Sequence, residues 1–405
     1  MRLRASRSVS TRAAHHRTAA AAALLTLAGL AGCDSTVDGS QGGPGASEAS
    51  ESAKPEPVRL STSFQDARAV PIDEPVTVRT DGGVLDAVTV TSAEGSLDGT
   101  LDGGAWTSAS RLEPGTDYTI TASATRSDGS RIERTRSFST VDLTLDEQTY
   151  AAIAPLDGET VGVGMPVVVT FDLPVTDRAL FEEHMHVTSA PEQRGSWYWL
   201  SDREAHWRPV SYWKPGTDVS VDLDVNSLPA GNGIYGQESR SIDFHIGDSV
   251  VSRVDVRGHI MRTFVNGQLA RTIPISAGKA GWETRSGTKV IIEKFRRKRM
   301  NAATIGVDRD DPEYYNLSNV QYALRVTYSG EFLHAAPWST GSQGSANVSH
   351  GCVGMSLADA QWLYDRTSRG DVVEVTGSSR SMTLDNGYGD WNLSRADWKA
   401  GSALS

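Results

Sequence analysis

Short stretches of alternating apolar and polar residues, separated by turn residues, fill residues 58–148. Val76–Val78 and Tyr118–Ala122 carry an apolar side chain at every second position. Because successive side chains of a strand point to opposite faces, this period of two predicts half-buried β-strands. Asp98-Gly99 is one of several Asp-Gly pairs between the stretches, which predict hairpins and loops. We expect an immunoglobulin-like β-sandwich here.

Residues 149–248 repeat this pattern. Val167–Phe171 and Val219–Leu223 predict strands, and the Pro-Gly-Thr-Asp sequence that starts at Pro114 returns at Pro215. In both places it leads directly into an alternating strand, which favours a tandem repeat of one immunoglobulin-like architecture. Neither region contains a cysteine, so neither has the disulfide that joins the two sheets in antibody domains.

Aromatic residues and histidines cluster in this second region. Two functions fit the aromatic residues: a sugar-stacking surface, or a sandwich core that also packs against the next domain, and we favour the core. The histidines could form a metal site because residues i and i+2 of a strand share a face. Neither a carboxylate nor a cysteine completes that site in sequence, and we expect no metal. The aromatic residues are Trp197, Tyr198, Trp199, Trp207, Tyr212 and Trp213, and the histidines are His184, His186 and His206.

Residues 249–377 combine predicted strands with one predicted helix. Asn266-Gly267 lies between two alternating stretches and predicts a tight hairpin. Ser356 with Asp359 resembles a capping box, and the apolar positions that follow predict a short helix to Arg366. We expect Trp391 and Trp398 to pack the C-terminal segment, residues 378–405, back onto residues 249–377.

Composition narrows the class of protein. The length of 405 residues predicts two to three domains, and 38% hydrophobic with 22% charged residues excludes a largely disordered chain and a polytopic membrane protein. The net charge of −11 argues against nucleic-acid binding. Residues 248–377 are different, since 16 Lys and Arg outnumber 13 Asp and Glu. Two cysteines are too few for a disulfide framework or a cysteine-rich zinc module.

The N-terminus resembles an export signal. Residues 1–32 contain five arginines and no acidic residue, and the apolar run Ala19–Leu30 is too short to span a bilayer by itself. The run leads into Leu30-Ala31-Gly32-Cys33, which resembles the bacterial lipobox and implies lipidation of Cys33. The alternative is an ordinary signal peptide with an incidental cysteine. Residues 33–57 are rich in Ser, Gly, Ala, Glu and Pro, which predicts a flexible tether.

The second cysteine, Cys352, is a candidate nucleophile. A lone free thiol in an exported protein suggests a reactive role, although a buried inert cysteine is the general alternative. The thiolate is the reactive form, and a nearby histidine can take the thiol proton. His350 lies two residues away, and His334 could approach from a separate strand as the general base. Gly351 has no Cβ, so the backbone can approach a substrate carbonyl and offer N–H groups to an oxyanion.

These residues form a known pattern. His334, fourteen intervening residues and Ser349-His350-Gly351-Cys352 resemble the YkuD-type L,D-transpeptidases. The longer strings His334-Ala-Ala-Pro-Trp-Ser and Asn347-Val-Ser-His-Gly-Cys are similar to the multi-domain actinobacterial lipoprotein enzymes. The resemblance implies a mainly β chain: two tandem immunoglobulin-like sandwiches, residues 58–148 and 149–248, then a catalytic domain, residues 249–377, and a C-terminal segment.

The resemblance also implies roles for these residues. Cys352 would be the acyl-accepting nucleophile and His334 its base, with the imidazole ring held by the carbonyl of Ala335. His350 and Ser349 would support the site, while the amides of Gly351 and Cys352 would face the oxyanion.

A second set of residues would bind the substrate. A tyrosine hydroxyl assists in related enzymes, and its counterpart here is Tyr315, with Tyr314 as the alternative. Met300 and Trp338 would form the wall of the cleft, and Ala335 and Asn347 complete the expected substrate-binding set. The basic run Lys294–Arg299 is either a solvated hairpin or a lid that attracts anionic ligands. Gly354 departs from the family, in which many members have Asn or Arg two residues after the cysteine.

The implied reaction joins two peptidoglycan stem peptides. Cys352 would attack a tetrapeptide donor at its third-position diamino acid, release D-alanine and transfer the acyl group to the diamino acid of an acceptor stem. Carbapenems would acylate Cys352, and no metal, organic cofactor or nucleic acid is expected. The enzyme would be lipid-anchored on the extracytoplasmic face of the membrane, facing the cell wall. The alternatives are an L,D-carboxypeptidase, protein anchoring through the same thioester, a non-catalytic wall-binding lipoprotein and a metal-dependent peptidase.

Overall fold

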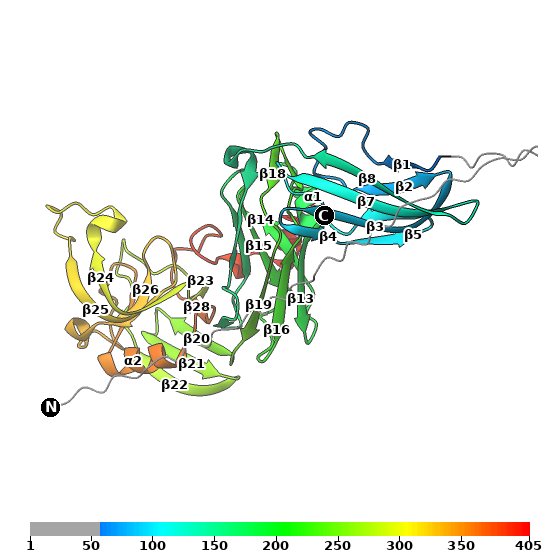
Figure 1. Ribbon diagram of the computed structural model, residues 1–405. Coiled ribbons are helices and arrows are strands. Elements are labelled where there is room, and N and C mark those ends of the chain that lie inside the picture. The colour runs from blue at the N-terminus through cyan, green and yellow to red at the C-terminus, as the bar shows by residue number, and fades with distance from the viewer. Residues whose placement is uncertain (1–56) are drawn as a thin grey trace, which may run out of the picture. The chain divides into compact units, whose positions relative to one another are not determined.

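The structure is a computed structural model that describes residues 57–405 (Figure 1). The expected signal peptide, Cys33 and nearly all of the tether lie outside the described residues. Within residues 57–405, no helix is both long enough and apolar enough to cross a bilayer.

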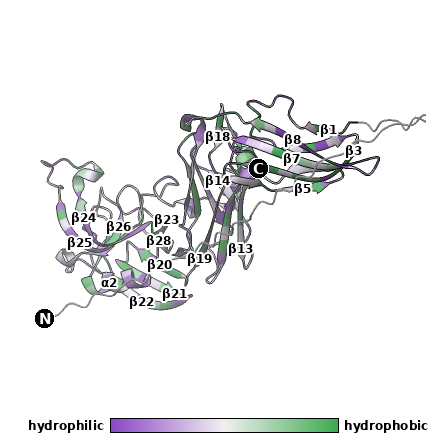
Figure 2. Cartoon of the chain, viewed as in Figure 1, coloured by the Kyte–Doolittle hydropathy of each residue, from purple (hydrophilic) through white to green (hydrophobic). Residues whose placement is uncertain are grey.

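The first region consists of two four-stranded sheets, ordered β1-β2-β6-β5 and β4-β3-β7-β8. Its strands are β1 (Arg59–Thr62), β2 (Thr77–Asp81), β3 (Gly83–Ser92), β4 (Gly95–Leu97), β5 (Gly99–Asp102), β6 (Ala105–Ser108), β7 (Asp117–Arg126) and β8 (Arg131–Ser139). Strand β7 shows why these residues form a sheet, because Tyr118, Ile120 and Ala122 are buried while the residues between them are half-exposed. Figure 2 shows hydrophilic and hydrophobic residues alternating along these strands. The predicted strands here are confirmed.

The second region also has two four-stranded sheets, ordered β10-β12-β15-β14 and β11-β19-β16-β13, with a small sheet β17-β18-β9. Its elements are the 3-10 turn Leu145–Glu147, β9 (Gln148–Thr149), β10 (Ala151–Ala154), β11 (Thr160–Val161), β12 (Val167–Phe171), α1 (Arg178–Glu183), β13 (Met185–Ala190), β14 (Gly195–Trp199), β15 (Glu204–Pro209), β16 (Asp218–Leu223), β17 (Pro229–Gly231), β18 (Ile234–Gly236) and β19 (Arg240–Ile246). Helix α1 and the parallel pair β11–β19 distinguish this region from the first. The exact domain boundaries stay predictions.

The tryptophans of the second region belong to its core. Trp197, Trp199, Trp207 and Trp213 are all buried. The indole N–H of Trp197 donates to the carbonyl of Met185 at 2.9 Å, so the polar end of this ring is satisfied inside the protein. Rings that are buried in this way cannot stack on a sugar, and the sugar-binding alternative is therefore wrong for these four residues.

The third region contains a five-stranded sheet, β22-β21-β20-β28-β23, and a four-stranded sheet, β24-β25-β26-β27. Its elements are β20 (Val250–Asp255), β21 (Ile260–Val265), β22 (Gln268–Pro274), β23 (Gly287–Val290), β24 (Glu293–Asn301), the 3-10 turn Ala302–Ile305, β25 (Asn316–Arg325), β26 (Phe332–Ala335), the 3-10 turn Pro337–Ser339, β27 (Val353–Met355), α2 (Leu357–Arg366), β28 (Val372–Thr376), the 3-10 turn Asp390–Asn392 and α3 (Arg395–Lys399). Asn266 and Gly267 both have positive φ, 48° and 79°, and form the predicted hairpin turn between β21 and β22.

Helix α2 begins and ends where the sequence predicts. The Ser356 side chain accepts a hydrogen bond from the backbone N–H of Asp359 at 3.1 Å, which caps the first turn. Ala360 and Leu363 are buried and join an apolar cluster with residues of β25, β26 and β27. The helix thereby supports the two strands that carry the candidate catalytic residues.

The C-terminal segment contacts both the second and the third region. The Asn392 side chain exchanges hydrogen bonds with the backbone of Thr288 at 2.8 and 2.7 Å, in the third region. The indole N–H groups of Trp391 and Trp398 donate to the carbonyls of Gly164 and Ser196, which belong to the second region. The Arg208 guanidinium of β15 lies over both rings, 4.7 and 4.5 Å from their centroids. The prediction that these two tryptophans pack on residues 249–377 is therefore wrong. One buried apolar cluster also joins the second region to Val290 and Val372 of the third.

His206 explains part of this packing. Its ring is fully buried, and its two nitrogens lie 2.8 Å from a carboxylate oxygen of Asp390 and 2.8 Å from one of Glu204. Burial by itself lowers the pKa of His206, but the charges and hydrogen bonds of the two carboxylates outweigh burial and raise the pKa to about 9. The protonated ring thus joins β15 to the C-terminal segment, and the structure assigns His206 to this ion cluster.

The raised pKa of His206 predicts a loss of stability at alkaline pH. A histidine whose folded pKa lies above its unfolded value of 6.5 stabilises the fold fully below pH 6.5, and this contribution disappears as pH rises towards 9. The shift corresponds to about 3 kcal/mol. We expect the free energy of unfolding, measured with urea, to fall more steeply between pH 6.5 and 9 in the native protein than in His206→Gln. Equal pH slopes for the two proteins would contradict this assignment.

Candidate active site

A cavity of about 290 Å³ opens in the third region beside the ends of β24, β26 and β27. Most of the residues that we predicted for the site line this cavity, together with several residues that we did not predict. The nominated lining residues are Met300, Tyr315, His334, Trp338, Ser349, His350 and Cys352. The others are Ser276, Leu317, Ala336, Ser339, Val348 and Gly354. Tyr315, rather than Tyr314, thus lies at the cavity.

Two adjacent parallel strands bring the base and the nucleophile together. His334 lies on β26, Cys352 comes directly before β27, and the register places His334 opposite Gly354. Residues that are eighteen positions apart therefore meet at one end of the same strand pair. Trp338 follows β26, and its exposed ring stacks against the His334 ring at 5.8 Å between centroids.

The His334 ring is held in one orientation. Its Nδ1 lies 2.8 Å from the carbonyl oxygen of Ala335, to which it donates, so Nε2 is left as the proton acceptor. Burial lowers the pKa of His334, although the bond to Ala335 works against this effect. The resting ring is therefore neutral, as a general base must be.

The Cys352 thiol is protonated at rest. Its Sγ donates to the carbonyl oxygen of Gly330 at 3.7 Å. Burial raises the pKa of the thiol to about 12, with a further increase from the negative charge of Glu331. Among residues 57–405, no hydrogen bond joins this thiol to the His334 ring. The resting pair is thus a neutral thiol and a neutral imidazole, which differs from the expected thiolate–imidazolium pair.

Comparisons with known proteins agree with this geometry. Residues 249–375 match the YkuD family, described as the L,D-transpeptidase catalytic domain, and residues 67–229 match the bacterial Ig domain family. L,D-transpeptidase 2 of Mycobacterium tuberculosis (strain CDC 1551 / Oshkosh) is 37% identical over 350 residues, which cover 85% of each chain. The chain belongs to the YkuD L,D-transpeptidase family.

Two further relatives support this assignment. L,D-transpeptidase 5 of Mycobacterium tuberculosis (strain ATCC 25618 / H37Rv) is 33% identical over 367 residues, 87% of this chain and 79% of that protein. The solved structure of LD transpeptidase LdtMt1 in complex with imipenem has 36% identity and a TM-score of 0.50, and it covers 57% of this chain and 99% of its own. The protein is therefore an acyltransferase, and the immunoglobulin-like match spans both front regions as a single stretch.

In the free protein the Gly351 amide already has a partner, so its expected role towards an oxyanion stays a prediction. The backbone N–H of Gly351 donates to the Ser349 hydroxyl at 3.1 Å, and that hydroxyl donates to the carbonyl of Cys352 at 2.6 Å. Ser349 thus braces the loop that carries the nucleophile. Gly351 has a φ of 116°, a conformation that residues with a Cβ rarely adopt, so the glycine is required by the backbone.

Asn347 and Ala335 do not line the cavity of the transpeptidase. The Asn347 side chain accepts from the backbone N–H of Ala277 at 2.9 Å and donates to the carbonyl of Val256 at 3.0 Å. It therefore ties the loop before Cys352 to the five-stranded sheet. Ala335 is 1% exposed and acts through its carbonyl on His334. The expectation that these two residues bind substrate stays a prediction, and in the free protein both have structural contacts.

Gly354 has a steric reason to differ from its counterparts. A Cβ at this position would lie 2.9 Å from the Cβ of Ala336, closer than such atoms approach. A larger residue would push β27 away from the segment that follows β26. The absence of a side chain also widens the cavity, of which Gly354 is part.

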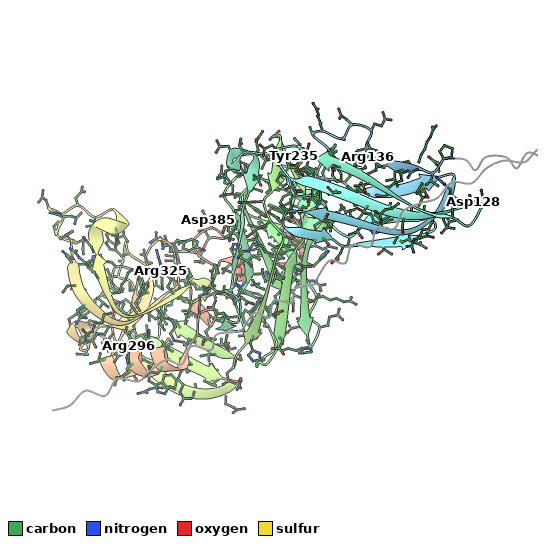
Figure 3. The ribbon with its side chains drawn as sticks, viewed as in Figure 1. Asp128, Arg136, Tyr235, Arg296, Arg325 and Asp385 are labelled. Atoms are coloured by element: carbon green, nitrogen blue, oxygen red, sulfur yellow. The ribbon has the colours of Figure 1, made fainter. Side chains whose placement is uncertain are left out.

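The basic run forms strand β24 of the transpeptidase. Lys294 lies with its ammonium 4.5 Å from the Tyr364 ring centroid, on helix α2. Arg296, labelled in Figure 3, is exposed, as are Arg297 and Arg299. The run ends at Met300, a residue of the cavity wall. Whether the run acts as a lid stays a prediction.

Sequence reasoning missed Glu313. Its carboxylate accepts from the Lys279 ammonium at 2.5 Å and from the His350 ring at 2.8 Å, and these two partners lower its pKa. His350 also contacts the Tyr315 ring, at 5.0 Å between centroids. His350 therefore links the loop before Cys352 to the segment that carries Tyr315. The only signal in the sequence is that Glu313 lies two residues before Tyr315.

The raised thiol pKa of the transpeptidase predicts slow alkylation of Cys352 in the free enzyme. Because the rate is proportional to the thiolate fraction, it should rise about tenfold per pH unit from pH 6 to 9 without a plateau. The measurement is iodoacetamide alkylation followed by intact-protein mass spectrometry. A plateau near neutral pH would instead show a preformed thiolate–imidazolium pair.

Proposed function

We propose that this chain cross-links peptidoglycan stem peptides through a thioester on Cys352. The observation that carries the proposal is the meeting of Cys352 and His334 at one cavity, on adjacent parallel strands. The nucleophile lies at the wall of a cavity large enough for part of a peptide, and the base has its free nitrogen fixed by Ala335. The family supplies the reaction class.

The first half of the reaction forms the acyl-enzyme. As Sγ of Cys352 attacks the carbonyl carbon of the third stem residue, Nε2 of His334 takes the thiol proton. Tyr315 keeps its hydroxyl proton, since burial raises its pKa to about 12, and donates a hydrogen bond to the developing oxyanion. The carbon–nitrogen bond then breaks, and His334 returns the proton to the departing D-alanine amine.

The second half transfers the acyl group. A side-chain amine of an acceptor stem attacks the thioester carbonyl, His334 takes the amine proton, and the thiolate of Cys352 leaves and regains that proton. If water replaces the amine, the same thioester gives carboxypeptidase activity, and if a protein amine replaces it, a protein is anchored to the wall. We favour the stem amine because the relatives are named L,D-transpeptidases.

β-Lactam inhibition is part of the same proposal. A related transpeptidase has been solved in complex with imipenem. A β-lactam carbonyl presents Cys352 with the same electrophile as the donor stem, and ring opening replaces release of D-alanine. We expect carbapenems to acylate Cys352 of this chain.

The reaction can be tested with the purified full-length protein and a disaccharide-tetrapeptide. Native protein should give a Cys352 acyl-enzyme and a cross-linked dimer with release of D-alanine, whereas Cys352→Ala should give neither. Mass spectra of protein and products provide both readouts. D-alanine release without dimer would favour the carboxypeptidase, and no cysteine-dependent product from a folded protein would favour a binding lipoprotein.

We further propose that Cys33 is lipidated and holds the enzyme on the extracytoplasmic face of the membrane, with residues 33–57 as a tether. The support is the sequence Leu30-Ala31-Gly32-Cys33 with the polar stretch that follows it. Acyl chains on one cysteine give stable anchoring when more than one is attached. In cells that express the chain, Cys33→Ala should prevent labelling by a palmitate analogue and move the protein out of the membrane fraction. Labelling retained in Cys33→Ala would refute the assignment.

A further inference from the structure

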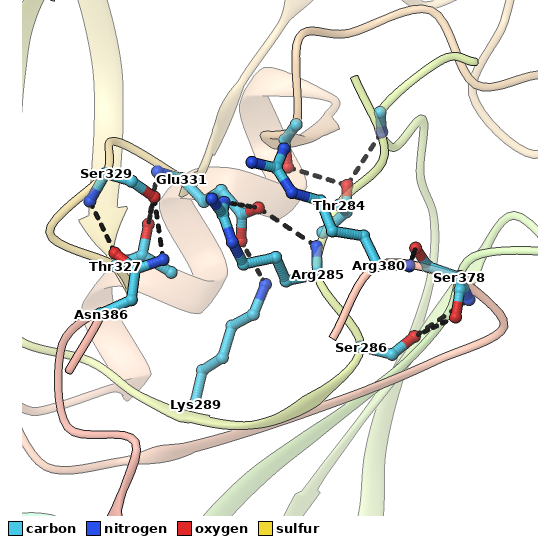
Figure 4. Close-up of polar contacts among 12 residues, drawn as sticks. Thr284, Arg285, Ser286, Lys289, Thr327, Ser329, Glu331, Ser378, Arg380 and Asn386 are labelled. Atoms are coloured by element: carbon cyan, nitrogen blue, oxygen red, sulfur yellow. Dashed lines mark hydrogen bonds and ion pairs between the residues drawn. The ribbon is translucent and has the colours of Figure 1, made fainter. Parts of the chain in front are cut away.

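Lys289, Glu331 and Arg285 form an ion cluster in the third region (Figure 4). The carboxylate of Glu331 accepts from the Lys289 ammonium at 2.5 Å and from the Arg285 guanidinium at 2.8 Å. Lys289 is 1% exposed and Glu331 is 4% exposed. None of the three lines the cavity, so the reaction as described above does not use them.

Glu331 belongs to the turn that contacts the thiol. Gly330, which precedes it, accepts the Sγ–H of Cys352, and the backbone N–H of Phe332, which follows it, favours the thiolate. The backbone N–H of Glu331 donates to the Thr327 hydroxyl at 2.8 Å. The ion pair with Lys289 on β23 therefore fastens the turn that faces the nucleophile to the five-stranded sheet.

The same segment also holds the residue before the nucleophile. Thr284 donates through its hydroxyl to the carbonyl of Gly351 at 2.8 Å, and the next residue, Arg285, donates its backbone N–H to Glu331 at 3.1 Å. A Cβ built on Gly351 would lie 3.7 Å from Oε1 of Glu331, which shows how closely the two segments approach. The Gly330–Phe332 turn and the Gly351 backbone, which lie on either side of Sγ, are thus both held by residues 284–289.

Stability alone does not account for the two buried charges of Lys289 and Glu331. Taking charges out of water costs free energy that their mutual attraction offsets only with good geometry, and apolar residues of similar volume often serve as well. The charges of Lys289 and Glu331 both reach the buried thiol, where water screens them little. The charge of Lys289 favours the thiolate of Cys352, whereas that of Glu331 opposes it.

We propose that Lys289, Glu331 and Arg285 form a positioning cluster for Cys352. The cluster fixes the Gly330–Phe332 turn against Sγ, and the positive charge of Lys289 offsets the negative charge of Glu331 that faces the thiol. The proposal rests on Cys352 being the nucleophile of the proposed function. It follows that the two members of the Lys289–Glu331 pair have opposite effects on the readiness of the Cys352 thiol to lose its proton.

The test compares alkylation of Cys352 by iodoacetamide at pH 8 in Lys289→Met and Glu331→Gln. Loss of the positive charge should slow alkylation about tenfold for each unit by which the thiol pKa rises, and loss of the negative charge should accelerate it. A merely structural role would loosen the site in both variants and expose the thiol in both. Lys289→Met that is folded, by its thermal melt, and alkylates as fast as the native protein or faster would overturn the proposal.

Two further proteins keep the test decisive. Glu182→Gln removes another buried carboxylate, in the second region and away from Cys352, and should leave alkylation unchanged. If Lys289→Met does not fold, Lys289→Met combined with Glu331→Gln removes both partners of the pair and should alkylate more slowly than Glu331→Gln alone. Equal rates for these two would overturn the proposal. Alkylation needs no stem peptide. A failure of the cross-linking reaction would therefore be distinguishable from a failure of the positioning proposal.

Discussion

The parallel pairing of β26 with β27 is the constraint on which the active site depends. Parallel strands cannot be joined by a tight turn, so the chain must travel from His334 to Cys352 through a connection that runs outside the sheet. That connection supplies Trp338, Val348 and Ser349, and these residues form the cavity wall around the two reacting groups. The seventeen residues between His334 and Cys352 are thus the crossover that two parallel strands require, and they form one wall of the cavity.

Local patterns predicted the elements of this fold well. The alternation along β7, the Asn266-Gly267 turn and the Ser356 cap are decided by residues that are neighbours in sequence, and all three have the expected form. The cysteine and its base were also predictable, because their chemistry restricts the residue types and the family motif fixes their spacing.

Roles that depend on distant partners were not predictable. Asn347 has the polar side chain of a substrate ligand, but its hydrogen bonds run to Val256 and Ala277, which lie 91 and 70 positions earlier in the chain. Glutamate is usually found at the surface, and Glu331 is buried here in ion pairs with Lys289 and Arg285. In each case the decisive contact joins segments whose proximity follows from the tertiary fold, and no local signal marks it.

The docking of Trp391 and Trp398 on the second region has a consequence for biosynthesis. During translation, all residues of the catalytic motif leave the ribosome before these two rings exist. Until they arrive, the faces that they cover and the His206 side chain lack their partners. A chain that stopped after β28 would contain every residue of the catalytic motif and both sheets of the third region, but it would leave apolar side chains of the second region uncovered. Burial of this face of the second region therefore depends on residues that are made after the catalytic motif.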